Sequence, residues 1–134
     1  MNTVVFDTNI LIDHVHGFAP WVAECLEKPE RFLLVIPTIV IAEYSTAQEL
    51  ETTAGMEKSS AYLSLFKAQD LTKEIAETLG TILRRKTHVP SADLGDLIIA
   101  ATAITLNAPL ATRNKNHFAN IPNLHFFDPS TINN

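Results

Sequence analysis

Val4-Val5-Phe6-Asp7-Thr8-Asn9, near the start of this 134-residue chain, is the stretch that most directly predicts its fold. Three β-branched or aromatic residues lead into an acid, which is typical of a buried strand that ends at Asp7. In an open α/β sheet, ligands bind in the crevice beyond the carboxyl ends of the strands. Asp7 is therefore predicted either to serve a binding site or to cap the next helix, a position that Asp also favours.

Strands and helices are predicted to alternate along the rest of the chain. Buried strands are expected at residues 32–36, 110–112 and 124–127, and helices at residues 10–16, 20–27, 39 to about 52–55, 56–66, 72–86 and 91–106, whereas residues 68–71 allow no assignment. Thr38 and Ser91 are the expected caps of the third and the last of these helices. The alternation indicates βαβ units, so we expect one α/β domain over residues 1–134, with a mostly parallel sheet covered on both faces.

The composition is ordinary for a soluble globular domain, with 46% hydrophobic and 19% charged residues. No apolar run reaches the ~18 residues that a membrane span needs, and the first residues do not form a secretion signal. The single cysteine, Cys25, can form no internal disulfide and has no second cysteine with which to bind zinc. We therefore expect a protein of the reducing cytoplasm.

The charged residues are unevenly placed. A net charge of −5 argues against a passive nucleic-acid binder, which would normally be basic. Half of the ten lysines and arginines nevertheless flank the segment around Asp93 and Asp96, namely Arg84, Arg85, Lys86, Arg113 and Lys115. This group is either a solvated helix end with a charged loop or a rim that contacts phosphate.

Glu43 and Asp96 are acids beside predicted apolar helix faces. Glu43 has Ile39 at i−4 and Leu50 at i+7, and Asp96 precedes the apolar residues 97–101. We expect Asp96 to lie too far inside its helix to be a cap. A buried unpaired carboxylate is very costly, so each acid must reach solvent, find a partner or bind a metal. For Glu43, an exposed position in the first turns of a helix is the alternative.

The remaining polar residues are weaker candidates. Asp93 shares a helix face with Asp96 at i−3, and it is either a helix-start residue favoured by the helix dipole or a member of the same site. The loop after the strand at 110–112 offers hydrogen-bonding groups in Thr112 and Asn114 and cations in Arg113 and Lys115, or it is a polar loop without a task. The histidines, His14, His16, His88, His117 and His125, show no metal-ligand spacing with the acids and are expected at the surface or in loops.

Taken together, these segments resemble those of PIN-domain ribonucleases, in particular the toxins of virulence-associated toxin–antitoxin pairs. The matching segments are residues 6–12, 39–43, 96–103 and 110–114 together with Phe118. Their order and spacing suit the whole chain, and it is the four together that make the resemblance specific. The resemblance implies a compact α/β/α sandwich whose acids converge on Mg²⁺ or Mn²⁺.

The resemblance also implies roles for individual residues. The three acids of the family fall on Asp7, Glu43 and Asp96, as metal ligands and catalytic residues. A fourth acid of the family falls where this chain has Asn114, which leaves the number of metal ions open. Asn114 could orient a water molecule, and Asp93 could supply the missing charge. Supporting roles fall on Thr8, Asn9 and Thr112, and RNA contacts on Arg113 and Lys115.

The function that the resemblance implies is metal-dependent endoribonuclease activity. Family members commonly form homodimers and are silenced by a small antitoxin that fills their groove. One alternative is a phosphatase with Asp7 as nucleophile, but that chemistry typically needs a second acid two residues later, where this chain has Asn9. The other alternative is a non-catalytic module that binds a partner protein, which Asn114 leaves open.

Overall fold

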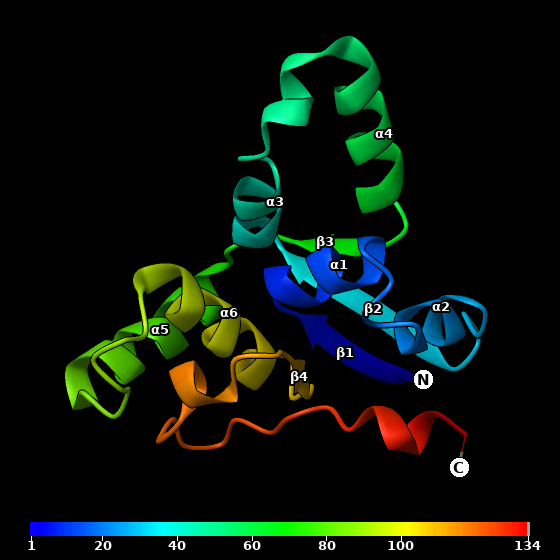
Figure 1. Ribbon diagram of the computed structural model, residues 1–134. Helices are drawn as coiled ribbons and strands as arrows, with labels where there is room; N and C mark the ends of the chain where they lie inside the picture. The colour runs from blue at the N-terminus through cyan, green and yellow to red at the C-terminus, as the bar shows by residue number, and fades with distance from the viewer. Residues whose placement is uncertain (134) are drawn as a thin grey trace.

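β1 (Asn2–Phe6) is the predicted opening strand and lies in the interior of the sheet. A computed structural model, which describes residues 1–133 apart from the side chains of residues 48 and 49, contains a four-stranded sheet in the order β3-β2-β1-β4 (Figure 1). β2 (Phe32–Pro37) and β4 (Leu110–Ala111) flank β1, and β3 (Lys67–Gln69) lies beside β2. All three pairings are parallel, which confirms the predicted α/β fold with a parallel sheet.

The parallel register brings the carboxyl ends of the strands to one edge of the sheet. Val5 is paired with Val35 of β2 and with Leu110 of β4. Asp7 therefore leaves the sheet beside the residues that follow β2 and β4. The last three residues of β1 are fully buried, as expected for a parallel strand covered on both faces.

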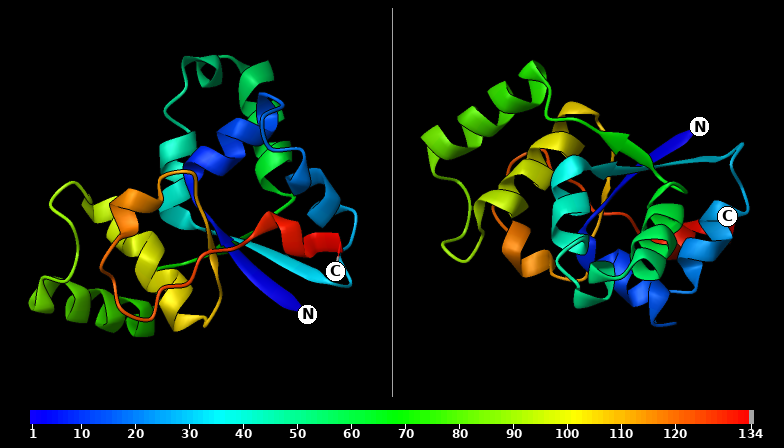
Figure 2. Two further views of the ribbon diagram at one scale, coloured as in Figure 1. Left: turned by 60° about the horizontal axis from the view of Figure 1, so that its bottom comes forward. Right: turned by 90° about the horizontal axis from the view of Figure 1, so that it is seen from above.

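Helices cover both faces of this sheet. In the described part of the chain they are α1 (Thr8–Val15), α2 (Trp21–Leu26), α3 (Thr38–Tyr44), α4 (Thr53–Leu63), α5 (Lys73–Arg85) and α6 (Leu94–Thr105), with short 3-10 helices η1 (Gln48–Glu51), η2 (Lys115–Phe118) and η3 (Pro129–Asn133). Figure 2 shows α1, α2 and α4 on one side of the sheet and α5 and α6 on the other. This is the expected α/β/α sandwich. Across residues 1–133, no helix is long and apolar enough to cross a membrane.

Phe6, the residue directly before Asp7, is held by an aromatic cluster. Its ring packs against Trp21 of α2 at a centroid distance of 5.7 Å and against Phe66, just after α4, at 5.6 Å. Such aromatic pairs each contribute about 0.5–1.5 kcal/mol beyond the area they bury. The end of β1 is thus fixed against α2 and the turn after α4, which positions Asp7.

The third predicted helix is wrong in length, because α3 ends at Tyr44 instead of continuing to about residues 52–55. The Thr46 hydroxyl donates to the carbonyl of Glu43 at 2.9 Å, so it competes with the backbone bonds that would extend the helix. A separate helix, α4, follows. Leu50 consequently does not share a helix face with Glu43.

The strand predicted at residues 124–127 is also wrong. This stretch makes one isolated parallel bridge, between Leu110 and Phe126, because β4 has only two residues and provides no longer ladder. The sheet is completed instead by β3 at residues 67–69, a strand that was not predicted and that overlaps the unassigned residues 68–71.

Candidate metal centre

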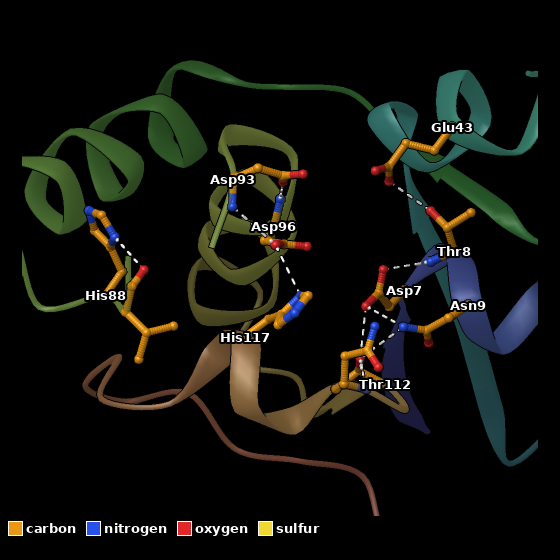
Figure 3. Close-up of polar contacts among 11 residues, drawn as sticks. Asp7, Thr8, Asn9, Glu43, His88, Asp93, Asp96, Thr112 and His117 are labelled. Carbon is orange, nitrogen blue, oxygen red and sulfur yellow. Dashed lines mark hydrogen bonds and ion pairs between the residues drawn. The ribbon is translucent and has the colours of Figure 1, made fainter. Parts of the chain in front are cut away.

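Asp7 lies at the end of β1 and is only 6% exposed. Its Oδ1 atom accepts a hydrogen bond from the Thr8 N–H at 2.7 Å, which makes Asp7 the N-cap of α1. Its Oδ2 atom accepts from the Thr112 hydroxyl at 2.7 Å and from Asn9 Nδ2 at 3.1 Å (Figure 3). Burial raises the pKa of Asp7, and these hydrogen bonds oppose the rise. The cap and the binding-site interpretations of Asp7 are therefore compatible.

Asn9 and Thr112 join Asp7 to the loop after β4. Asn9 Oδ1 accepts from the Arg113 N–H at 3.1 Å, and the Thr112 hydroxyl oxygen accepts from the Asn114 N–H at 3.1 Å. The Asn9 amide is thus oriented at both ends, since its nitrogen donates to Asp7. The side chains of Asn9 and Thr112 both contact Asp7, whereas Asn114 contacts Thr112 through its backbone N–H.

Glu43 reaches the same edge of the sheet on α3, which begins directly after β2. Its Oε1 atom accepts from the Thr8 hydroxyl at 2.7 Å, so Thr8 contacts Glu43 through its side chain and Asp7 through its backbone. Burial raises the pKa of Glu43, and the charges of Asp7, Asp93 and Asp96 raise it further against the Thr8 hydrogen bond.

Asp93 and Asp96 form a reciprocal cap at the start of α6. Asp93 Oδ1 accepts from the Asp96 N–H at 2.8 Å, and Asp96 Oδ2 accepts from the Asp93 N–H at 3.1 Å. The helix therefore begins at Leu94 with Asp93 as its N-cap, not after Ser91, because the two aspartates satisfy each other's backbone donors. The expectation that Asp96 lies too far inside the helix to act as a cap is wrong.

The four acids point toward one another from three parts of the fold: Asp7 at the end of β1, Glu43 on α3, and Asp93 and Asp96 at the start of α6 (Figure 3). Burial raises the pKa of Asp96, and the charges of Asp93 and Asp7 add to this rise, while the backbone hydrogen bond from Asp93 opposes it. The fold thus gathers carboxylates that repel one another, which favours a bound cation.

Gly95 allows α6 to approach α3 at this point, and it is not among the site residues predicted from the sequence. A Cβ atom at this position would lie 3.2 Å from Asp93 Oδ1, 3.4 Å from Glu43 Oε2 and 3.7 Å from Ile39 Cγ1. The available signal was a glycine inside a helical pattern, which lowers helix stability by about 1 kcal/mol relative to Ala and so calls for a packing reason.

His117 contacts one of the acids from the surface position expected for the histidines, a contact that the sequence did not predict. Its Nδ1 atom lies 3.6 Å from Asp96 Oδ2. η2 holds it there, since the neighbouring Phe118 is buried in the core. Nothing in the local sequence gives this contact, because it depends on how η2 packs against α6.

The donor set fits a hard divalent cation better than zinc. Carboxylate oxygens are the ligands that Mg²⁺ and Mn²⁺ prefer. Among residues 1–133, no three acidic, histidine or cysteine side chains are close enough to hold an ion by themselves. Mg²⁺ tolerates such an arrangement, because it is commonly held by one or two carboxylates and keeps several waters, whereas structural zinc needs four protein ligands.

The two cations predicted to contact RNA follow β4 in the sequence, and the structure gives each of them one side-chain partner. Arg113 Nη1 is 2.6 Å from Asp13 Oδ1 on α1. Lys115 Nζ lies 5.6 Å from the centroid of the Phe126 ring. Both side chains thus have partners outside the acid cluster.

The fold and the site together define a class: an α/β protein whose clustered carboxylates, at the carboxyl edge of a parallel sheet, suit a bound cation. The sequence model of the PIN domain matches residues 4–124. The chain belongs to the PIN-domain family, which confirms the resemblance found in the sequence.

Individual relatives cover nearly the whole chain. Ribonuclease VapC19 of Mycobacterium tuberculosis is 32% identical over 129 residues, which cover 90% of this chain and 95% of that protein. VapBC2 from Rickettsia felis, solved bound to a DNA fragment from its promoter, matches with a TM-score of 0.74 and 25% identity over 93% of this chain and 97% of that chain. A toxin–antitoxin complex from Klebsiella pneumoniae matches with a TM-score of 0.67 and 30% identity over 94% of this chain and 97% of that chain.

Proposed function

We propose that this chain is a metal-dependent endoribonuclease and the toxin of a toxin–antitoxin pair. The observation that carries the proposal is the convergence of Asp7, Glu43 and Asp96 at the carboxyl edge of a PIN-domain sheet. A relative named a ribonuclease and structural neighbours that are toxin–antitoxin complexes support the choice of activity and role. The phosphatase alternative loses support, because Asn9 donates to Asp7 Oδ2 where a second acid would be needed.

In this proposal Asp7, Glu43 and Asp96 hold Mg²⁺ or Mn²⁺ directly or through water molecules, with Asp93 as a nearby fourth charge. When bound, such an ion activates a water molecule and stabilises the negative charge that builds on the scissile phosphate. Thr8 keeps two of the carboxylates in place, since it donates to both Asp7 and Glu43.

The loop after β4 contributes the remaining polar groups. Thr112 and Asn9 fix the orientation of Asp7 through its Oδ2 atom. Asn114 has an amide side chain in the position of the family's fourth acid, and it orients a water molecule there. Arg113 and Lys115 add positive charge beside an acidic site, which guides the phosphodiester strand toward it.

An antitoxin segment is proposed to occupy the groove beside Glu43. This groove, of about 540 Å³, lies between α1, α3 and α4 and is lined by Ile12, Val15, Tyr44 and Tyr62 as well as by Glu43. Ile12 and Val15 are 40% and 51% exposed, so an apolar segment of a partner would cover them. A partner in this groove would also block Glu43. The homodimer and the cytoplasmic location expected from the sequence remain predictions.

The test of the proposed activity is cleavage of single-stranded RNA by the purified protein. We expect internal cuts with Mg²⁺ or Mn²⁺ and none with EDTA, because the carboxylates alone would repel the phosphodiester. Sequencing the ends of the products separates endonucleolytic cuts from degradation at the termini. RNA that stays intact with either metal would contradict the nuclease and favour the partner-binding module.

Metal binding should also change how the stability of the protein depends on pH. The raised pKa values of Asp7, Glu43 and Asp96 mean that each carboxyl binds a proton more tightly in the folded chain than in the unfolded chain. These groups therefore destabilise the folded chain at neutral pH, and the destabilisation is lost as the pH falls through the raised values toward the ordinary ones.

In EDTA we accordingly expect this site to favour a higher melting temperature as the pH is lowered from 7 toward the ordinary carboxyl pKa values of 3.8 and 4.5. Mn²⁺ should raise the melting temperature at pH 7 and raise it less at a pH near those ordinary values, because protons compete with the ion for the same carboxylates. Differential scanning fluorimetry with and without Mn²⁺ measures both effects. A metal-induced shift of equal size at the two pH values would show that the ion binds elsewhere.

A further inference from the structure

Asp13 and Arg113 form an ion pair on the flank of the acid cluster. Arg113 Nη1 lies 2.6 Å from Asp13 Oδ1, and the side chains of Arg113 and Asp13 are 60% and 13% exposed. The backbone N–H of Arg113 also donates to Asn9 Oδ1 at 3.1 Å. Asn9 and Asp13 share one helix face, because they are four residues apart on α1. Arg113 binds this face through its backbone N–H and through its guanidinium.

The side chain of Asn9 connects Arg113 to the proposed metal centre. The nitrogen of the Asn9 side chain donates to Asp7 Oδ2, while its oxygen receives the backbone of Arg113. The guanidinium of Arg113 is therefore held about one turn of α1 away from the residue that orients Asp7. Such a fixed relation between a cation and a metal ligand is what recognition of a strand crossing the site requires.

The guanidinium keeps most of its binding capacity in this position. It has five N–H donors in a planar fork, and the structure gives one contact, to a single Asp13 oxygen, from the Nη1 atom. Its large exposed fraction leaves the other donors accessible, and phosphate is the anion that a planar fork matches well. A flexible arginine would lose side-chain freedom on binding, and an arginine already fixed by Asp13 loses less of it.

We propose that Asp13 is a positioning residue, which fixes Arg113 as a phosphate-binding group for the RNA strand beside the acid cluster. This inference rests on the proposed nuclease function and adds to it a residue that acts through Arg113. Because the Arg113 side chain is 60% exposed, solvent screens this ion pair and it stabilises the fold only slightly, so a purely structural role would leave the kinetics with RNA almost unchanged.

The experiment compares Asp13→Asn, Arg113→Gln and the double variant in steady-state RNA cleavage at several salt concentrations. Arg113→Gln should raise KM by about tenfold, keep kcat within about twofold, and reduce the slope of log(kcat/KM) against log[salt] by about 0.7, which is one phosphate contact on a single strand. Asp13→Asn should raise KM by about threefold to tenfold. The double variant should be no worse than Arg113→Gln, because the two residues act as one unit.

Two controls separate positioning from other effects. Glu30→Gln removes one negative charge before β2, at the opposite edge of the sheet, and should leave KM and the salt slope unchanged. Melting temperatures report whether Asp13→Asn keeps its fold, and Arg113→Lys, which keeps the charge without the fork, should keep the salt slope while raising KM.

Each outcome decides the inference. If Asp13→Asn leaves KM and the salt slope as in the wild type, the ion pair is only structural. If it lowers KM, Asp13 competes with phosphate for Arg113, and the inference is again overturned. A wild-type protein that does not cleave RNA would overturn the proposed function and this inference with it, whereas active wild type with an unchanged Asp13→Asn variant overturns this inference alone.

Discussion

Replacement of Asp7 by Asn should reduce RNA cleavage by at least about 100-fold, since even residues that only support a metal ligand typically contribute 10–100-fold. Asp7 is the carboxylate that the fold orients most completely, with three hydrogen bonds to its two oxygens. Asparagine has the same shape but no charge, so the site would lose one proposed ligand and a unit of the negative charge that holds the cation.

The same change should leave the protein folded. The carboxylate of Asp7 is buried and its pKa is raised, so its charge destabilises the folded chain at neutral pH. Removing that charge offsets the hydrogen bonds that Asn9 and the Thr112 hydroxyl can no longer donate to the Oδ2 position. We therefore expect a melting temperature close to that of the wild type in EDTA, together with a much smaller shift on addition of Mn²⁺.

Cleavage rates and melting curves for Asp7→Asn, with Glu30→Gln as a charge-matched control, measure these effects. A folded Asp7→Asn protein that cleaves RNA at the wild-type rate, from a preparation free of other nucleases, would remove Asp7 from the catalytic centre. The same result would contradict the metal site proposed around Asp7.

Asp96→Asn should lower cleavage by about 100-fold or more, whereas Asp93→Asn should lower it by less than about tenfold. Both asparagines keep an acceptor for the reciprocal cap of α6, so the two variants differ mainly in which charge they remove. Burial raises the pKa of Asp96, and the charges of Asp93 and Asp7 raise it further. A cation bound beside Asp96 would relieve this repulsion, so we expect the charge of Asp96 to be needed for metal binding. Asp93 has an exposed side chain and a structural task as the N-cap.

Asp93→Ala provides the matched test of that structural task. Loss of the cap should lower the free energy of unfolding by about 1 kcal/mol, measured by urea denaturation, while Asp93→Asn should leave it nearly unchanged. Equal losses of cleavage in Asp93→Asn and Asp96→Asn would instead assign both acids to the metal centre and make Asp93 the replacement for the family's fourth acid.

The parts of the fold that follow from local pattern were predictable from sequence. β1 and β2 contain continuous runs of β-branched and large apolar residues, at residues 4–6 and 32–36, and parallel strands covered on both faces need such runs. Asp7 could be placed at the edge of the sheet because it ends the first of these runs. Glu43 and Asp96 stood out because each acid borders apolar residues.

The remainder depends on side-chain contacts, some local and some between distant segments, that the periodicity of apolar residues does not encode. The end of α3 is decided by a side-chain hydroxyl that competes with the helix, and the start of α6 by two aspartates that cap each other. His117 meets Asp96 only because η2 packs against α6. Likewise, the ion pair between Asp13 and Arg113 joins segments that lie 100 positions apart, so its role could not be deduced before the fold was known.

The central place of β1 in the sheet has a consequence for the order of events on the ribosome. β1 can pair with β2 early in synthesis, but its other edge is completed only when the Val5 and Asp7 N–H groups bond to the carbonyls of Pro109 and Ala111. Asp7 and Thr112 are separated by 105 positions, which correspond to roughly 5–20 s of synthesis. A nascent chain therefore cannot complete the hydrogen bonds around Asp7 until Thr112 has been made and has left the ribosome.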